Sequence, residues 1–91
     1  VVIGKHVCIS QGALILSGNH DFSKSTFDLI VQPITIEDGA WIGAKSVVTQ
    51  GVTVASHAVL AVSSVASSSL ESYSIYRGNP AVKVKERVIN S

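Results

Sequence analysis

The chain has 91 residues, of which 46% are hydrophobic and 5% aromatic, and its formal net charge at pH 7 is +1. This length allows one small domain, and the near-neutral charge argues against a nucleic-acid-binding protein, which would carry a basic face. The single cysteine, Cys8, excludes an internal disulfide and fits a reducing compartment. Since no apolar run of twenty residues and no signal-peptide pattern is present, we expect no membrane span and a cytoplasmic location.

The first residues show an aliphatic side chain at every sixth position: Ile3, Ile9 and Ile15. Gly4 and Gly12 fall where tight corners with a positive φ are expected. The pattern is already in phase when the chain starts, and the sequence contains no Met. We therefore interpret the chain as an N-terminally truncated fragment of a longer protein.

This register breaks after Leu16, and the next clear aliphatic position is Ile30 or Ile36. Residues from about 17 to 33, SGNHDFSKSTFDLIVQP, therefore form an inserted loop with a polar tip. Loops that project from a rigid scaffold often carry the chemistry of a protein.

The six-residue period is clearest between residues 36 and 67. The aliphatic leads of successive units are Ile36, Ile42, Val48, Val54, Leu60 and Ala66. Four places after each of the first five leads stands a small or β-branched residue: Ala40, Ser46, Val52, Ala58 and Ser64. This period fits neither a helix nor an ordinary strand. It predicts three-sided coils, in which each face is a strand of five or six residues followed by a tight corner. Successive coils would stack about 4.8 Å apart, with both residue sets facing inward.

The pattern fades from Ser67 into a Ser-rich connector. A turn is expected at Gly78-Asn79-Pro80-Ala81, because Gly permits the bend and Pro stops strand pairing. The sequence leaves open whether the last ten residues form a strand or a helix. We expect residues 1–71 to form the coils with their inserted loop, and residues 72–91 to form a connector and tail.

Three motifs carry a resemblance to a known family: the Ile-Gly pairs, the loop NHDFSKSTFDLI followed by PITIEDGAWIGA, and the terminal GNPA. Together they resemble the hexapeptide-repeat acyltransferases, and more narrowly the colanic acid biosynthesis and maltose or galactoside O-acetyltransferases. The resemblance implies an all-β fold, a single-stranded left-handed parallel β-helix. The handedness comes from the resemblance alone, because parallel crossovers generally favour the right hand.

The same resemblance implies the partners and the reaction. It implies a homotrimer with active sites between subunits, and acetyl-CoA as co-substrate. The implied acceptor is a sugar hydroxyl of an exopolysaccharide or oligosaccharide precursor, acetylated by direct transfer in polysaccharide biosynthesis.

His20 is the main catalytic candidate. An imidazole near neutral pH suits removal of the alcohol proton during attack, and the resembled enzymes hold their catalytic His in a loop before the WIG repeat. The alternative is an inert surface histidine. Asp21 is the second catalytic candidate, as a residue that orients or stabilises His20, and Asp28 could play the same part. The alternative for Asp21 is a cap of a turn in the loop.

The resemblance also implies the cofactor contacts. Trp41 would lie beside the thioester of the cofactor, and the backbone amide of Ala44 would face its carbonyl as an oxyanion donor. The remaining contacts would be the backbone of Val62, the hydroxyl of Ser67, and Lys83 and Lys85 at the phosphates. The family's usual IGAGSVVTKD reads LAVSSVASSS here, so that Val62 narrows the groove and no lysine stands at Ser68. The alternatives are a Trp41 that packs a corner and a solvated basic tail.

His6 and His57 fall at corners without partners at ligand spacing, so we interpret them as surface residues and expect no metal site. Two other functions stay open from the sequence. One is a non-catalytic β-helical scaffold or binding fragment. The other is an acyltransferase of the same superfamily that acts on an amine or a serine.

Overall fold

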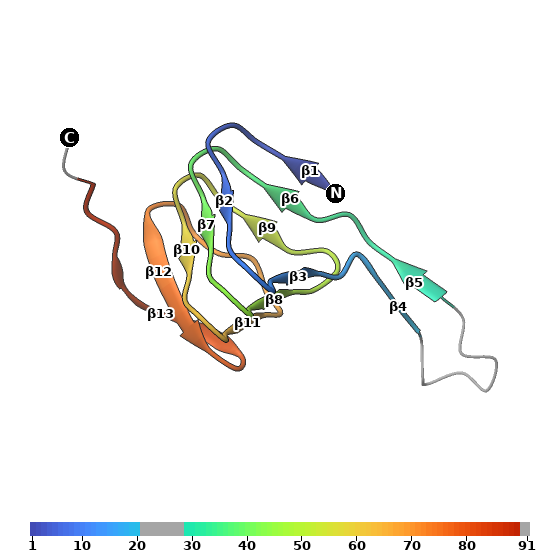
Figure 1. Cartoon of the computed structure of the whole chain (residues 1–91). Coiled ribbons are helices and arrows are strands. Elements are labelled where there is room, and N and C mark those ends of the chain that lie inside the picture. The colour runs from blue at the N-terminus through green and yellow to red at the C-terminus, as the bar shows by residue number, and fades with distance from the viewer. Residues whose placement is uncertain (21–28, 90–91) are drawn as a thin grey trace.

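In the computed structural model, residues 1–20 and 29–89 are described, and the regular elements among them are β-strands (Figure 1). Three coils follow one another along the chain. The first consists of β1 (Val2–Ile3), β2 (Cys8–Ile9) and β3 (Leu14–Ile15). The second consists of β6 (Thr35–Ile36), β7 (Trp41–Ile42) and β8 (Val47–Val48), and the third of β9 (Thr53–Val54), β10 (Val59–Leu60) and β11 (Val65–Ala66).

Equivalent strands of successive coils pair in parallel and build three flat faces. Their strand orders are β1-β6-β9, β3-β8-β11 and β2-β7-β10-β12-β13, the last ending in one antiparallel strand. The register aligns the aliphatic leads, so that Ile9 pairs with Ile42 and Ile42 with Leu60. Each coil therefore covers the side chains of the next, which is how a small solenoid builds a narrow core.

The interior confirms the predicted inward positions. All six leads from Ile36 to Ala66 are at most 1% exposed, and the five small residues between them are at most 2% exposed. The buried hydroxyl of Ser46 donates to the carbonyl of Gly43 at 2.6 Å, which satisfies it inside the corner. The strands are shorter than predicted, with two residues per face in the three coils, because the other residues of each unit form the corner.

The corners use left-handed backbone conformations, and not only at glycine. His6, Lys45, His57, Ser63 and Tyr73 have φ values between 51° and 60°. The prediction for Gly12 is confirmed by its φ of 74°. The prediction for Gly4 is wrong, because the left-handed residue of that corner is His6. Gly4 is needed for close approach instead: a Cβ there would lie 2.8 Å from the backbone nitrogen of Asp38 in the next coil.

A hairpin leaves the solenoid between β3 and β6 and projects away from the coils (Figure 1). Its strands β4 (Gly18–His20) and β5 (Leu29–Val31) pair antiparallel, with Asn19 opposite Ile30. The hairpin lies within the predicted insertion of about 17–33. Asp21 and Asp28 fall outside the described residues, as does the side chain of His20.

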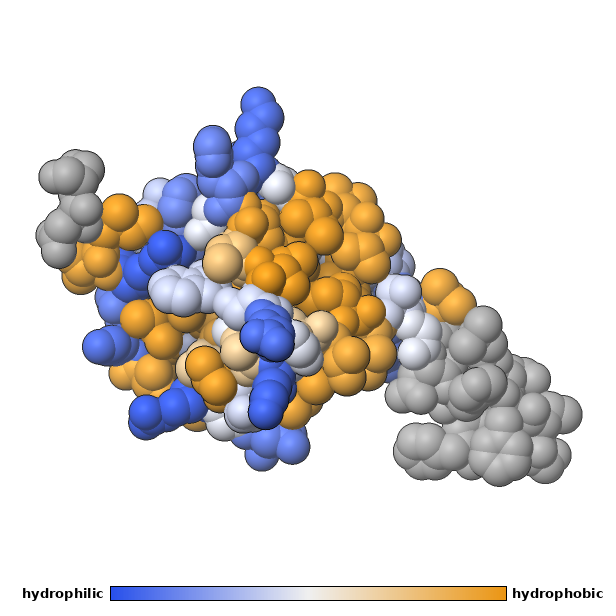
Figure 2. All heavy atoms as spheres, in the orientation of Figure 1, coloured by the Kyte–Doolittle hydropathy of each residue, from blue (hydrophilic) through white to orange (hydrophobic). Residues whose placement is uncertain are grey.

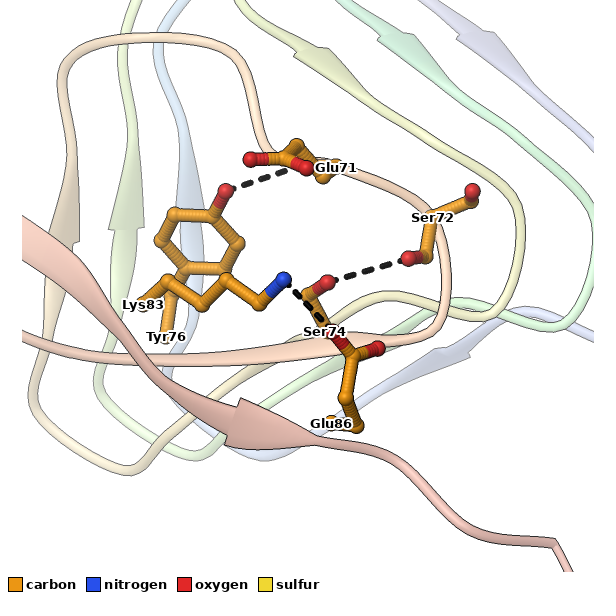
Figure 3. Close-up of polar contacts among 6 residues, drawn as sticks. All are labelled: Glu71, Ser72, Ser74, Tyr76, Lys83 and Glu86. Carbon is orange, nitrogen blue, oxygen red and sulfur yellow. Dashed lines mark hydrogen bonds and ion pairs between the residues drawn. The ribbon is translucent and has the colours of Figure 1, made fainter.

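The C-terminal segment forms strands. β12 (Ser74–Gly78) pairs in parallel with β10 and turns through Asn79-Pro80 into β13 (Ala81–Glu86), which pairs antiparallel with β12. Figure 3 shows polar contacts of β12 with the segment before it, and one contact within β13. The Tyr76 hydroxyl accepts from the Glu71 backbone N–H at 3.1 Å, and the Ser74 hydroxyl donates to the Ser72 carbonyl at 3.0 Å. The division of the chain at residue 71 remains a prediction.

Hydrophobic side chains gather over the first coil (Figure 2). Val2, Ile3, Ile9 and Leu14 are each at least 40% exposed, although their counterparts in the second coil include the fully buried Ile36 and Ile42. Within the described part of the chain, no helix is long and apolar enough to cross a membrane.

Candidate functional site

An apolar groove of about 460 Å³ lies over the face that contains β2, β7 and β10. Strand alternation points Ile42 and Leu60 into the core, so Trp41 and Val59 face outward. The groove is lined by residues of three successive coils: Ser10, Trp41, Gly43, Ala44, Val59, Leu60, Ala61 and Val62.

Trp41 is the only tryptophan of the chain and forms one wall of this groove. It is 48% exposed, and it stands in register between Cys8 of β2 and Val59 of β10. Its indole Nε1–H donates to the Ser10 hydroxyl at 3.0 Å. A large apolar surface with a fixed polar edge is therefore presented to a ligand.

Gly43 determines how closely two coils approach at the groove. Its N–H donates to the Leu60 carbonyl at 2.8 Å. A Cβ on Gly43 would lie 2.6 Å from that carbonyl oxygen and 2.7 Å from the Val62 nitrogen. Because these are backbone atoms, no side-chain movement relieves the contact. The sequence Trp41-Ile42-Gly43 thus sets both the wall and the depth of the groove.

Ala44 follows Gly43 at the same corner. Its carbonyl accepts from the Ser63 N–H at 2.9 Å, whereas its own N–H makes no hydrogen bond with another of the residues that the structure describes. A free N–H beside an apolar groove can donate to an oxygen of a bound molecule.

Of the residues predicted for the site, Trp41, Ala44 and Val62 lie together in the groove. Ser67 is exposed and follows β11, a strand of another face, so it does not line this groove. The hairpin holds the backbone of His20 at the end of β4.

The two predicted lysines lie on opposite faces of β13. Lys85 pairs with Ile75, which faces outward as Trp41 and Val59 do, whereas Lys83 pairs with the inward-facing Tyr76. A register shift between Ile75 and Tyr76 causes this difference. Lys85 is three strands from Trp41, or roughly 14 Å at the usual strand spacing.

Lys83 is already engaged by an acidic side chain. Its Nζ lies 2.6 Å from Glu86 Oε1 (Figure 3), and this hydrogen bond raises the pKa of Lys83 above 10.5. Lys85 is therefore the better placed of the two lysines to meet an anion outside the sheet.

Sequence reasoning missed Ser10, because its contact with Trp41 joins residues 31 positions apart across the inserted loop. It also read His57 as a surface residue. His57 is half-buried, stacks on Tyr73 with ring centroids 4.6 Å apart, and lies 2.6 Å from the Ser56 hydroxyl through Nδ1. The Arg87 guanidinium donates to the carbonyls of Gly39 and His57. These contacts stabilise the corners of successive coils that contain Gly39, His57 and Tyr73, here called the corner column.

Among residues 1–20 and 29–89, no three His, Cys, Asp or Glu side chains come together in a group that could hold a metal ion. The arrangement there is instead suited to an extended, largely apolar ligand that carries a carbonyl and an anionic end.

Parallel three-sided coils with in-phase leads define the fold. The chain has the left-handed β-helical fold of the hexapeptide-repeat acetyltransferases. Its sequence is 35% identical over 88 residues to the Escherichia coli protein named "Putative colanic acid biosynthesis acetyltransferase WcaF". That match covers 97% of this chain and 48% of the relative, so the chain spans about half the length of the curated relatives it matches. No protein-family model matches the sequence.

Solved structures agree on the fold. The N-acyltransferase AntD of Bacillus cereus, in complex with dTDP-4-amino-4,6-dideoxyglucose and coenzyme A, matches with a TM-score of 0.88 and 20% identity. The match covers 96% of this chain and 52% of AntD. A hexapeptide-repeat acetyltransferase of Vibrio cholerae, in complex with acetyl coenzyme A, matches with a TM-score of 0.81 and 24% identity, over 96% and 60% of the two chains.

Proposed function

We propose that this protein is an acyltransferase that moves an acetyl group from acetyl-CoA to a hydroxyl of a sugar in a polysaccharide or oligosaccharide precursor. The observation that carries the proposal is the apolar groove with the half-exposed Trp41 at its wall. Sequence similarity along nearly the whole chain to a colanic acid biosynthesis acetyltransferase supports the sugar-related acceptor.

The residues of the groove fit the thioester end of acetyl-CoA. Its lining is aliphatic, aromatic or glycine apart from Ser10, which suits an apolar arm, and Trp41 flanks the reacting carbonyl. Val62, whose side chain is 65% exposed at the rim of the groove, contacts this arm. Lys85 meets the phosphates from the outward face of β13. Lys83 meets a phosphate only after its ion pair with Glu86 breaks, and the Ser67 hydroxyl contacts the cofactor outside this groove.

The reaction is a direct transfer without an acyl-enzyme. His20 removes the proton of the acceptor hydroxyl as its oxygen attacks the thioester carbonyl, with Asp21 orienting the imidazole. The Ala44 N–H donates to the oxyanion that develops on that carbonyl. The new C–O bond forms, the C–S bond breaks, and the proton passes from His20 to the departing thiolate, which gives the acetylated sugar and coenzyme A.

Assembly completes the site in this proposal. The hairpin projects from its own coils, so His20 acts on a groove of the next subunit in a homotrimer. The protein works in the cytoplasm, a compartment that supplies acetyl-CoA and keeps a free cysteine such as Cys8 reduced.

A second acceptor class has a specific observation in its favour. AntD, whose complex contains an amino sugar nucleotide, shares the fold closely. An amine would replace the hydroxyl as nucleophile in the same groove. Product analysis with matched hydroxyl and amine acceptors distinguishes the two reactions.

The test is a His20→Ala variant of the full-length protein, assayed for acetyl transfer. Loss of a positioned general base lowers the rate by about 10²–10⁴-fold. The matched control is His6→Ala, an exposed corner histidine on the first coil, which keeps the parental rate. An unchanged rate in the His20 variant, with retained β-sheet circular dichroism, overturns the assignment.

A further inference from the structure

Trp41 donates a hydrogen bond to Ser10 although its ring is half-exposed. Indole N–H groups generally find protein partners when they are buried, but Trp41 is 48% exposed and water could serve its Nε1. It donates instead to Ser10 Oγ at 3.0 Å, across two neighbouring coils. Both residues line the groove.

The surroundings of Trp41 leave the ring little other support. Its cross-strand neighbours on the outward face are Cys8 and Val59, which are small beside an indole. Gly43, which follows two residues later, offers no side chain. A half-exposed ring between small neighbours can adopt several rotamers, and each would change the wall of the groove.

Ser10 is itself held firmly. Its backbone N–H donates to the Ile42 carbonyl at 2.9 Å, directly after the pairing of Ile9 with Ile42. The half-buried side chain therefore starts from a fixed backbone, and its hydroxyl is a short, rigid acceptor for the indole. A residue of the first coil, Ser10, thus holds the indole of Trp41 in the second coil by a hydrogen bond.

We propose that Ser10 is a positioning residue that fixes the Trp41 ring in the orientation that receives the acyl-CoA thioester. The fixed ring itself is a statement about the protein alone, whereas its effect on acetyl-CoA binding rests on the proposed function. Prior selection of the binding-competent rotamer raises apparent affinity in proportion to the population of that rotamer. Removal of one hydrogen bond of ordinary net strength changes such a population about twofold to tenfold.

The experiment compares the parent with Ser10→Ala, Ser10→Thr and Ser68→Ala. Threonine keeps a hydroxyl at the same place, and Ser68 is an exposed serine outside the groove. Because Trp41 is the only tryptophan, the long-wavelength tryptophan bands of near-ultraviolet circular dichroism and the decay of tryptophan fluorescence anisotropy report its ring. Acetyl-CoA is then titrated into each protein by calorimetry.

The expected result is a weaker near-ultraviolet tryptophan signal and faster local ring motion in Ser10→Ala, with parental spectra in the other two variants. The dissociation constant for acetyl-CoA is expected to rise about twofold to tenfold in Ser10→Ala only. Identical ring motion in Ser10→Ala and the parent overturns the positioning role. So does an altered ring with unchanged affinity, or a Ser10→Thr protein that is folded but behaves as Ser10→Ala.

Failure of the proposed function gives a different pattern. A parent protein that binds no acetyl-CoA contradicts the acyltransferase assignment and the consequence for binding. The spectra of the variants still decide whether Ser10 fixes the ring.

Discussion

Replacement of Gly43 by alanine tests whether two backbones meet at the groove. The added Cβ would stand 2.6 Å from the Leu60 oxygen and 2.7 Å from the Val62 nitrogen, at a glycine whose φ is not in the left-handed region. The third coil must move away, which weakens the 2.8 Å hydrogen bond from Gly43 to Leu60. Overpacking costs about 1–3 kcal/mol and the hydrogen bond about 1 kcal/mol, so we expect a loss of about 2–4 kcal/mol in the free energy of unfolding.

The assay is urea unfolding followed by far-ultraviolet circular dichroism, with Gly12→Ala as the comparison. Gly12 occupies the equivalent corner of the first coil at a φ of 74°, and a Cβ there would lie 3.3 Å from the flexible Lys45 side chain. Alanine there costs mainly the left-handed conformation, about 1–2 kcal/mol. If Gly43→Ala loses no more stability than Gly12→Ala, the close approach of the second and third coils at the groove is refuted.

Three further predictions concern the core, the corner column and the C-terminal strands. Leu60→Ala, at a site with 0% exposure, is expected to lower the free energy of unfolding by about 2–5 kcal/mol, whereas Val82→Ala on the exposed outer strand changes it by less than about 0.5 kcal/mol in the same urea experiment. Arg87→Ala removes two hydrogen bonds, to Gly39 and His57, and is expected to cost about 1–3 kcal/mol by thermal unfolding; a shift no larger than that of Arg77→Ala, an exposed arginine, would argue against the role of Arg87. The ion pair with Glu86 raises the pKa of Lys83, so it stabilises the fold below pH 10.5, and this stability is lost as pH rises through the folded pKa. In Glu86→Gln this alkaline loss of stability is expected to disappear. A variant with the parental pH dependence would contradict the pairing.

The sequence was sufficient to predict the solenoid, because the buried residues follow a six-residue repeat that is visible in the sequence. Each lead from Ile36 to Ala66 is interior, and the small residues at the corners are interior as well. The strands of the hairpin, Gly18–His20 and Leu29–Val31, lie where the six-residue register breaks. These features follow from local spacing, which a single sequence displays.

Contacts between coils were harder to foresee, since they depend on how many residues separate equivalent positions. Ser10 and Trp41 lie in paired coils, but the inserted loop separates them by 31 positions in the sequence. A shift in register after Ile75 sends Lys83 and Lys85 to opposite faces, which spacing in the sequence does not show. The requirement for glycine at position 4 likewise comes from Asp38 of another coil rather than from its own turn.

The central claim is that the Trp41 groove is the acyl-CoA site, and a calorimetric titration of acetyl-CoA against a groove-filling variant tests it most directly. Val62 is 65% exposed at the rim, so Val62→Trp can fill the groove without disturbing the core, and Val82→Trp adds the same side chain at a 59% exposed site outside it. The account predicts saturable binding in the parent and in Val82→Trp, and none in Val62→Trp. Equal binding in all three proteins, or no binding in the parent, would contradict it.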